Sequence, residues 1–239
     1  MTPRAMWRSL ATPGRIRSQT KDLWRHIYNS FASDPFASAY RTVRPYTMSG
    51  DARLRGLYEA VQGVMEREIA GDVVECGTAR GGSAALLGLA MKESGRRKTL
   101  WVFDTFEGIP PPTRADPDYE IAAAYTGSFR GEMAEVTSLF DRLGILEHAR
   151  LVKGRFEDTI PRCDVGAIAV LHIDGDWYES VKVCLDYLYD RVSPGGIIQI
   201  DDYGHWAGAR KAVDEFLANR KITGRLRYLD YTGRQLVKA

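Results

Sequence analysis

The sequence predicts an α/β fold, with a doubly wound, mostly parallel sheet and an antiparallel hairpin at the C-terminus. Short apolar runs typical of strands alternate with segments of helical periodicity from residue 72 to residue 219, and this alternation is typical of a parallel sheet with crossover helices. An acidic residue or a glycine follows each expected parallel strand. Ligands of such sheets bind beyond the carboxyl ends of the strands, so we expect a ligand site there.

The expected elements follow one another without a linker. An amphipathic helix over 51–69 comes first, and Gly71 ends it. A last pair of strands, 226–231 and 235–238, flanks Thr232-Gly233 and is typical of a hairpin. Between them we expect strands at 72–76, 99–104, 150–153, 167–174 and 196–201, and helices at 81–93, 132–143, 178–191 and 207–219. Residues 46–239 are therefore expected to form one domain.

Composition excludes several classes of protein. The chain has 239 residues, is 44% hydrophobic and carries a net charge of +2, which argues against a disordered chain or a surface that binds nucleic acid throughout. Three cysteines are too few for a disulfide framework, and no apolar run approaches the ~20 residues of a membrane span. The N-terminus also lacks the apolar core of a secretory signal. We expect a cytoplasmic protein with no membrane span and no nucleic-acid partner.

Residues 1–45 are expected to form a basic N-terminal extension. The first 44 residues hold eight basic and two acidic side chains, a net charge of +6. This charge fits either a solvated surface or a contact with an anionic partner. Aromatic and aliphatic residues at helical spacing in 23–31 indicate that the extension packs against something, and it can serve as a lid over the acceptor.

The first expected strand ends in a glycine-rich turn, E-C-G-T-A-R-G-G-S at 75–83. Its spacing matches neither the dinucleotide fingerprint G-x-G-x-x-G nor a phosphate-binding P-loop. Glu75 would repel a pyrophosphate but attract an amino group, and Asp104, at the end of the second strand, suits ribose hydroxyls. A nucleoside that carries an amino acid satisfies both, which describes S-adenosylmethionine. The alternative is a plain strand–helix turn in which Glu75 caps the helix.

Three aspartates end two neighbouring strands. Asp174 closes the apolar run 167–173, and Asp201 and Asp202 close 196–200. Converging carboxylates repel one another unless a cation or protons neutralise them, and oxygen ligands favour Mg²⁺ before Ca²⁺ or Mn²⁺. Such an ion would hold a substrate hydroxyl and lower its pKa. The alternative is a set of solvated aspartates that cap helices.

Three further residues near this cluster have open roles. Asp176 is expected to be structural or to support the cluster from the following loop. His172 alternates within its strand and is expected to be a core histidine with satisfied hydrogen bonds. His205 lies in a glycine-containing loop beside the expected metal site; it is a candidate catalytic base, and a surface histidine is the alternative.

Several motifs taken together resemble the macrocin O-methyltransferase family. They are E-C-G-T-A-R-G-G from residue 75, W-V-F-D-T-F-E-G-I-P-P from 101, I-D-G-D-W-Y-E-S from 173, S-P-G-G from 193 and D-D-Y from 201. The resemblance covers about residues 45–220. It implies a Rossmann-like methyltransferase sheet and a class I enzyme that uses S-adenosylmethionine and Mg²⁺. Several members methylate sugar hydroxyls on bacterial natural products, and a homodimer is implied as well.

The resemblance also implies roles for individual residues. Asp174, Asp201 and Asp202 would bind the metal, with Asp174 also a proton acceptor. The residues implied to bind the methyl donor are Thr47, Met48, Glu75, Gly77, Gly81, Gly82, Ser83, Asp104, Phe156, Glu157 and Asp174. Two positions depart from the pattern: Ala79 stands where the family often has an aromatic residue, and Trp177 stands where the related catechol-type enzymes have a lysine base. The second departure favours Asp174 or His205 as the base.

The sequence thus predicts an S-adenosylmethionine-dependent O-methyltransferase that acts on a hydroxyl of a small glycosylated acceptor. Catechol or phenol methylation, a nicotinamide-dependent oxidoreductase and a non-catalytic relative of the fold are the alternatives. Loops set the acceptor, and we expect 105–131 and 203–209 to do so here, with the N-terminal extension.

Overall fold

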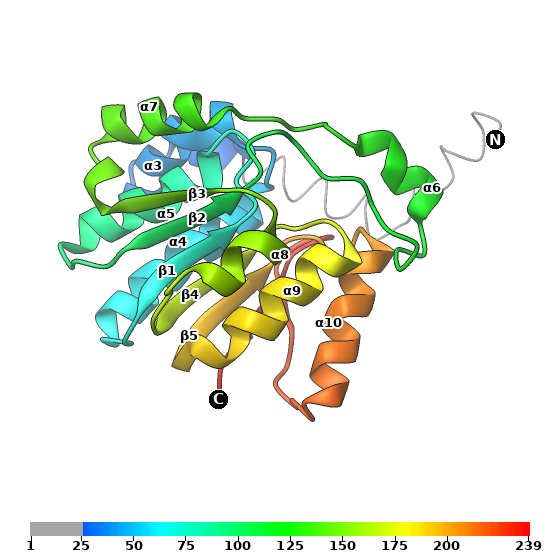
Figure 1. Cartoon of the computed structure of the whole chain (residues 1–239). Helices are drawn as coiled ribbons and strands as arrows, with labels where there is room; N and C mark the ends of the chain where they lie inside the picture. The colour runs from blue at the N-terminus through cyan, green and yellow to red at the C-terminus, as the bar shows by residue number, and fades with distance from the viewer. Residues whose placement is uncertain (1–25) are drawn as a thin grey trace.

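The computed structural model describes residues 26–239, so most of the predicted basic extension lies outside the described residues. The core is one sheet of seven strands in the order β3-β2-β1-β4-β5-β7-β6 (Figure 1). The strands are β1 (Asp72–Cys76), β2 (Leu100–Asp104), β3 (Ala149–Lys153), β4 (Ile168–Ile173), β5 (Val192–Ile200), β6 (Arg227–Tyr228) and β7 (Arg234–Val237). The first five are parallel, whereas β7 runs antiparallel to β5 and β6. The predicted fold class is confirmed.

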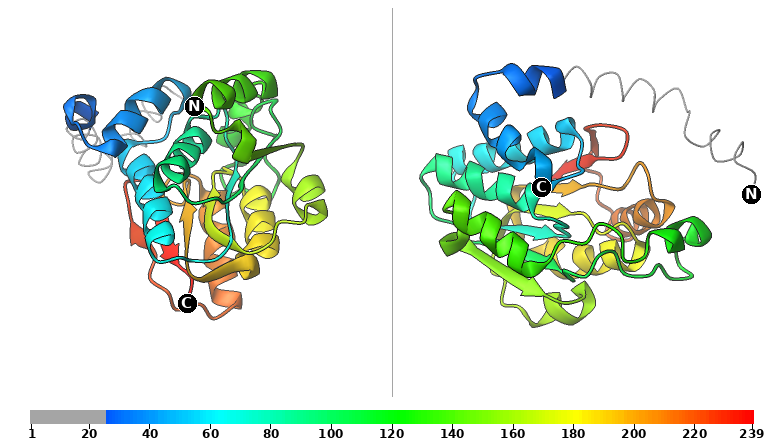
Figure 2. Two further views of the ribbon diagram at one scale, coloured as in Figure 1. Left: turned by 90° about the vertical axis from the view of Figure 1, so that its left-hand side faces the viewer. Right: turned by 90° about the horizontal axis from the view of Figure 1, so that it is seen from above.

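Helices cover both faces of the sheet, as Figures 1 and 2 show. One face packs against α3 (Pro35–Val43), α4 (Asp51–Glu66), α5 (Gly82–Ser94) and α7 (Met133–Leu143), and the other against α9 (Tyr178–Leu188) and α10 (Ala207–Asn219). Alternate residues of β1 separate the two cores, since Val73 belongs to the first and Val74 to the second. This alternation follows from the pleat of a strand.

The strand β5 begins earlier than the sequence indicates. Val192 pairs with Ile168, and the next pair is Ile197 with Val170, so an irregularity of several residues lies between them. The proline and two glycines of 193–196 resemble a turn in the sequence. The chain instead continues as a strand because this irregularity absorbs them.

The helix α3 was not predicted. Asp34 caps it by accepting a hydrogen bond from the Ala37 amide at 2.8 Å, and Pro35 occupies its first turn, where proline is tolerated. Phe36 and Tyr40 are buried in the first core. The helix α3 therefore packs as part of the same core, whereas Ile27, Tyr28 and Phe31, which the sequence predicted to pack against something, are exposed.

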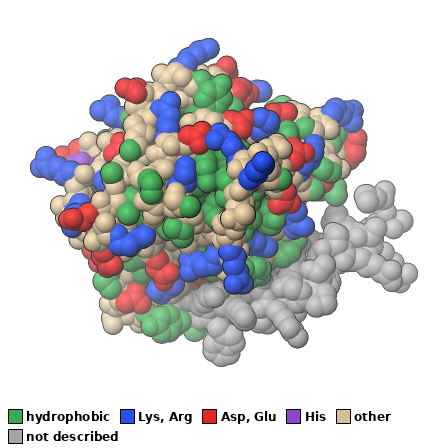
Figure 3. Space-filling view, turned by 90° about the horizontal axis from the view of Figure 1, so that it is seen from below, with side chains coloured by type: hydrophobic (Ala, Val, Ile, Leu, Met, Phe, Trp, Pro, Cys, Tyr) green, Lys and Arg blue, Asp and Glu red, His purple; other side chains and the backbone are tan. Residues whose placement is uncertain are grey.

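The surface carries charges of both signs. Basic and acidic side chains are interspersed on the face seen in Figure 3. Within residues 26–239, no helix has the length and apolar character needed to cross a membrane.

Candidate functional site

A cavity of about 340 Å³ lies at the carboxyl ends of the parallel strands. Most of its wall comes from the turns that follow β1, β2, β3, β4 and β5, which all meet at this edge of the sheet. The cavity is lined by most of the residues predicted to bind the donor or the metal or to accept the proton. These are Thr47, Met48, Gly77, Ser83, Asp104, Phe156, Glu157, Asp174, Asp202 and His205. Glu75, Gly81, Gly82 and Asp201 are not among its lining residues.

The turn between β1 and α5 is shaped by close contacts. Gly77 has a φ of +92°, and a Cβ there would lie 1.9 Å from the carbonyl oxygen of Asp174. A Cβ on Gly82 would lie 2.7 Å from the Thr47 side chain. Only glycine fits at both positions, so this turn brings the backbone beside both the aspartate and the 47–49 segment.

Asp104 holds this turn in place. Its Oδ2 accepts hydrogen bonds from the Thr78 amide at 2.7 Å and the Ala79 amide at 3.0 Å, and its Oδ1 accepts one from the Phe106 amide at 2.7 Å. Burial raises the pKa of Asp104, although these amides act in the opposite direction. Asp104 is thus a structural anchor of the cavity wall, which its sequence position did not reveal.

Two buried oxygens near this turn have no hydrogen-bond partner within residues 26–239. They are Glu75 Oε2 and Thr78 Oγ1. Leaving such a group unpaired costs about 1–3 kcal/mol. Thr78 lines the cavity, so a polar ligand can satisfy its hydroxyl, whereas Glu75 is fully buried and its Oε1 lies 2.9 Å from His172 Nδ1.

The three aspartates that face the cavity lie close together. Asp174, Asp176 and Asp202 each offer an oxygen within 4.8 Å of the others. Burial and the neighbouring carboxylates raise the pKa of Asp174 and of Asp176, and they raise that of Asp202 to about 6. The negative charges of these three carboxylates are therefore not fully balanced by nearby positive charges. Their oxygens are also the ligands that a hard divalent cation prefers.

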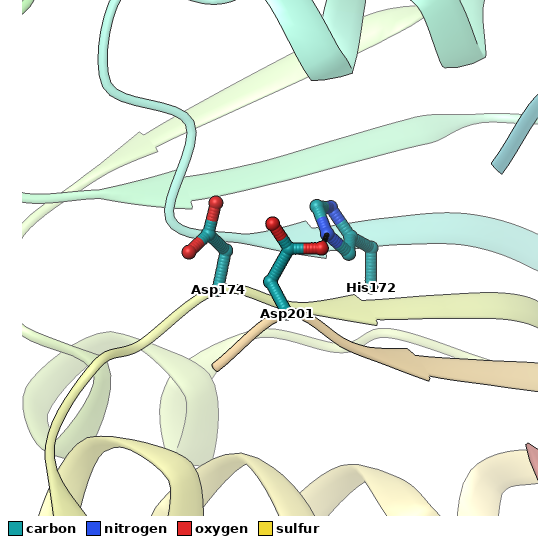
Figure 4. A group of neighbouring side chains, drawn as sticks. All are labelled: His172, Asp174 and Asp201. Carbon is teal, nitrogen blue, oxygen red and sulfur yellow. Dashed lines mark hydrogen bonds and ion pairs between the residues drawn. The ribbon is translucent and has the colours of Figure 1, made fainter. Parts of the chain in front are cut away.

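Asp201 lies beside this group but is held differently. Its Oδ2 accepts hydrogen bonds from Arg53 Nη1 and, at 3.2 Å, from Ser49 Oγ, and its Oδ1 contacts His172 Nε2 at 3.1 Å and Gln199 Nε2 at 3.4 Å. Burial alone would raise the pKa of Asp201, but Arg53 and His172 hold it well below its usual range. The three aspartates predicted as metal ligands are thus split, with Asp201 grouped with Asp174 and His172 (Figure 4).

His172 is a core histidine with both ring nitrogens engaged, as the sequence predicts. It bridges Glu75 on β1 and Asp201 after β5. Burial acts to lower the pKa of His172, yet the two carboxylates raise it to about 10. The imidazolium therefore balances two buried negative charges.

Several cavity residues were not predicted from the sequence. Arg53 lies within α4, and nothing in the local sequence distinguishes it from a surface arginine, yet its side chain is only 15% exposed. Asp176, which was expected from the sequence to be structural or to support the aspartate cluster, itself lines the cavity; its φ is +54°, and its amide donates to Asp202 Oδ2 at 3.1 Å. Tyr125, Phe129 and Thr232 also line the cavity from segments distant in the chain.

The 47–49 segment connects the cavity wall to the carboxylates. Arg44 Nη1 donates to the Thr47 carbonyl at 2.6 Å, and Ser49 donates to Asp201. On the opposite side His205 packs against Trp206, with ring centroids 4.7 Å apart. Most of the residues predicted for the donor, the metal and the proton thus border one cavity, whereas Glu75, Gly81, Gly82 and Asp201 do not.

Comparison with known proteins identifies relatives. A family model described as macrocin-O-methyltransferase matches residues 30–237. Over 194 residues the chain is 36% identical to the 8-demethyl-8-(2,3-dimethoxy-alpha-L-rhamnosyl)-tetracenomycin-C 4'-O-methyltransferase of Streptomyces olivaceus, covering 79% of this chain and 74% of that protein. It is 35% identical to the demethyldecarbamoylnovobiocin O-methyltransferase of Streptomyces niveus over 79% of this chain and 74% of that protein.

Solved structures agree with this result. The O-methyltransferase NovP superposes with a TM-score of 0.77 and 33% identity, over 81% of this chain and 82% of that one. The calicheamicin methyltransferase CalS11 superposes with a TM-score of 0.68 over 95% of this chain and 93% of that one; at 18% identity it shows the fold alone.

Proposed function

The chain belongs to the macrocin O-methyltransferase family and is an S-adenosylmethionine-dependent O-methyltransferase, and from this premise we propose that it methylates a sugar hydroxyl of a glycosylated natural product. The Streptomyces olivaceus relative acts on a rhamnosylated tetracenomycin, which supports a sugar acceptor here. The observation that carries the proposal is that the glycine turn at 77–83 and the aspartates after β4 and β5 border one cavity. A donor and a hydroxyl can therefore meet between them.

We assign the donor to the side of the cavity formed by β1 and β2. Gly77 and Ser83 bring the backbone and a hydroxyl to the cavity, and Asp104 fixes the loop between them. The unpaired Thr78 hydroxyl suits a carboxylate or an amino group, and Phe156 and Glu157 border the same side as adenine contacts. Thr47 and Met48 form a lid over the donor. Gly81 and Gly82 determine the backbone path of the turn, and Glu75 places a negative charge beside it, although these three residues do not line the cavity.

We assign Asp174, Asp176 and Asp202, whose oxygens lie within 4.8 Å of one another, to a divalent cation such as Mg²⁺, and we place the predicted ligand Asp201 beside them, where its oxygens are already bonded to other side chains. A bound cation supplies Lewis acidity, which lowers the pKa of a hydroxyl placed against it. Asp174 and Asp202 face the cavity, whereas Arg53 and His172 fix the orientation of Asp201. The raised pKa values of the cavity-facing aspartates support a role in binding positive charge.

The reaction needs a base for the hydroxyl proton. As the new oxygen–methyl bond forms, the methyl–sulfur bond of the donor breaks and the hydroxyl proton passes to a side chain. Asp174 and His205 are the bases predicted from the sequence, and Asp176 joins them because it lines the same cavity. Burial and the neighbouring carboxylates raise the pKa of both aspartates in the absence of a cation.

The site of methylation tests this proposal. The chain is incubated with isotopically labelled S-adenosylmethionine, Mg²⁺ and either a rhamnoside or a catechol, and the labelled position is determined by NMR. We expect label on a sugar hydroxyl, and exclusive labelling of the catechol would favour the phenol-type alternative. Asp202→Asn should abolish transfer, whereas Asp190→Asn, which changes an exposed aspartate paired with Arg220, should not.

A further inference from the structure

We infer that Tyr125 and Phe129 form an apolar platform for the ring system to which the acceptor's sugar is attached. The inference rests on the proposed function, because it concerns the acceptor side of the same cavity. Both side chains line the cavity, yet 37% of Tyr125 and 42% of Phe129 stay exposed. Exposed aromatic side chains at the mouth of a ligand cavity are typical of surfaces that bind an apolar group.

These two rings are the outer end of a series of five rings, which we call the aromatic arc. Neighbouring ring centroids along it are 6.2, 5.3, 4.7 and 6.0 Å apart. In order, its members are Phe129, Tyr125, Trp206, His205 and Tyr231. The arc joins three segments that are distant in the chain: the region after α6 (Tyr119–Ala122), the loop after β5 and the turn before β7.

The middle of the aromatic arc, at Trp206, lies beside the aspartates. The indole N–H of Trp206 donates to Asp176 Oδ1 at 3.0 Å, and Trp206 is buried. The arc then runs outward through Tyr125 to Phe129, whose exposed fractions are much larger. A sugar with its hydroxyl at Asp174 and Asp202 therefore has the arc along one side. The group attached to that sugar extends over the two exposed rings.

The charges of the cavity favour an apolar attachment over a phosphate. Among the described residues, Arg53 and Arg155 are the arginines that line the cavity. Arg53 is bonded to Asp201 and Asp230, and Arg155 Nη1 lies 3.6 Å from Glu157. A sugar nucleotide would place its phosphates over the same two rings, and both arginines that line the cavity are already paired with carboxylates, so the phosphates would lack a cation to balance their charge, which costs free energy. An apolar ring system has no such cost and gains by stacking on the arc.

The platform is held in place before any acceptor binds. The Ile109 amide donates to the Ser128 carbonyl at 3.0 Å, and the Gly127 amide donates to the Ile109 carbonyl at 2.8 Å. Both rings of the platform flank this pair of hydrogen bonds. A fixed aromatic surface loses little conformational entropy on binding, so the platform should discriminate between acceptors by affinity.

Calorimetric titration tests the platform with two probes that share a sugar, 4-nitrophenyl α-L-rhamnoside and methyl α-L-rhamnoside. S-adenosylhomocysteine and Mg²⁺ are present throughout. We expect the aryl probe to bind about tenfold tighter than the methyl probe, as for one well-stacked aromatic pair. Tyr125→Ala and Phe129→Ala should each reduce this ratio and leave the Kd of S-adenosylhomocysteine unchanged. Tyr125→Phe should preserve the ratio.

The control is Tyr187→Ala, which removes an aromatic side chain that is 46% exposed on α9 and does not line the cavity. It should change neither Kd. The inference would be overturned if the two probes bound with equal affinity or if neither bound. It would also be overturned if the ratio of the two Kd values stayed unchanged in both alanine variants, or if a rhamnose nucleotide bound more tightly than the aryl probe. Methyl transfer to the same two probes is followed in parallel samples that contain S-adenosylmethionine in place of S-adenosylhomocysteine. An aryl preference without transfer contradicts the proposed function alone, and transfer without a preference contradicts the platform alone.

Discussion

At the residue scale, the aspartates of the site fall into two groups, one paired with the protein's own cations and one facing the cavity. Arg53 and His172 keep Asp201 ionised, because both bond to it directly. Asp174 and Asp202 face the cavity with raised pKa values, and they gain most from an added cation. One aspartate is thus fixed by the protein's own cations, while its neighbours remain available for a ligand.

Arg53→Met should weaken both the fold and the metal site. It leaves Asp201 and Asp230 without their shared cation, and removing one partner of a buried ion pair costs about 3–5 kcal/mol. We expect a lower free energy of unfolding in urea and weaker Mg²⁺ binding by calorimetry. Arg53→Lys should recover part of both. Arg220→Met, which removes an exposed partner of Asp190, should leave both quantities close to wild type; equal losses in the two variants would contradict this role of Arg53.

His172→Phe should destabilise the metal-free protein in a pH-dependent way. Its pKa is about 10 in the fold against an ordinary 6.5, so its charge stabilises the fold fully below pH 6.5, and this contribution disappears as the pH rises through 10. The variant should therefore lose most stability near pH 6, and the difference from wild type should shrink toward pH 10. Urea unfolding in the presence of a chelator measures it. A difference that grows with pH would show that His172 is neutral in the fold.

At the element scale, the turn between β1 and α5 brings the proposed donor side of the cavity against Asp174. The role of its glycines could be predicted from the sequence, because it depends only on the backbone conformation of a few consecutive residues. The helix α3 was missed because four prolines spread over the first 45 residues suggested interruption, although Asp34-Pro35 is a good helix start. What the sequence did not show is that α3 packs in the first core and leads directly to the 47–49 segment of the cavity.

Gly77→Ala should weaken donor binding. The added Cβ would meet the Asp174 carbonyl oxygen at 1.9 Å, so the turn or the aspartate must move. We expect at least about a tenfold weaker Kd for S-adenosylhomocysteine, since the contacts depend on exact placement. Gly95→Ala is the matched control. It also has a positive φ, at +68°, but nothing lies within 4 Å of its added Cβ, so it should cost about 1 kcal/mol of stability and leave the Kd unchanged. Equal Kd values for both variants would contradict the steric argument.

At the scale of the whole molecule, the sheet order brings distant residues to one edge. The central strands β1 and β4 are neighbours, and β5 follows β4, so Gly77, Asp174 and Asp202 end side by side. The alternation of strands and helices and the acids at the strand ends were enough to predict this. The sequence could not show that Arg53 pairs with Asp201, 148 positions away, or that Tyr125 packs on Trp206. Such pairs depend on how loops and helices pack, and no local pattern encodes them.

The central claim is that the aspartates at this edge use a divalent cation to direct a sugar hydroxyl toward S-adenosylmethionine. The most direct test is the rate of labelled methyl transfer to a rhamnoside before and after exhaustive chelation, followed by titration with Mg²⁺. We expect transfer to fall by at least about a hundredfold on chelation, because the hydroxyl loses its Lewis acid, and to return with added Mg²⁺ in the wild type but not in Asp202→Asn. Full activity in the chelated protein would contradict the claim.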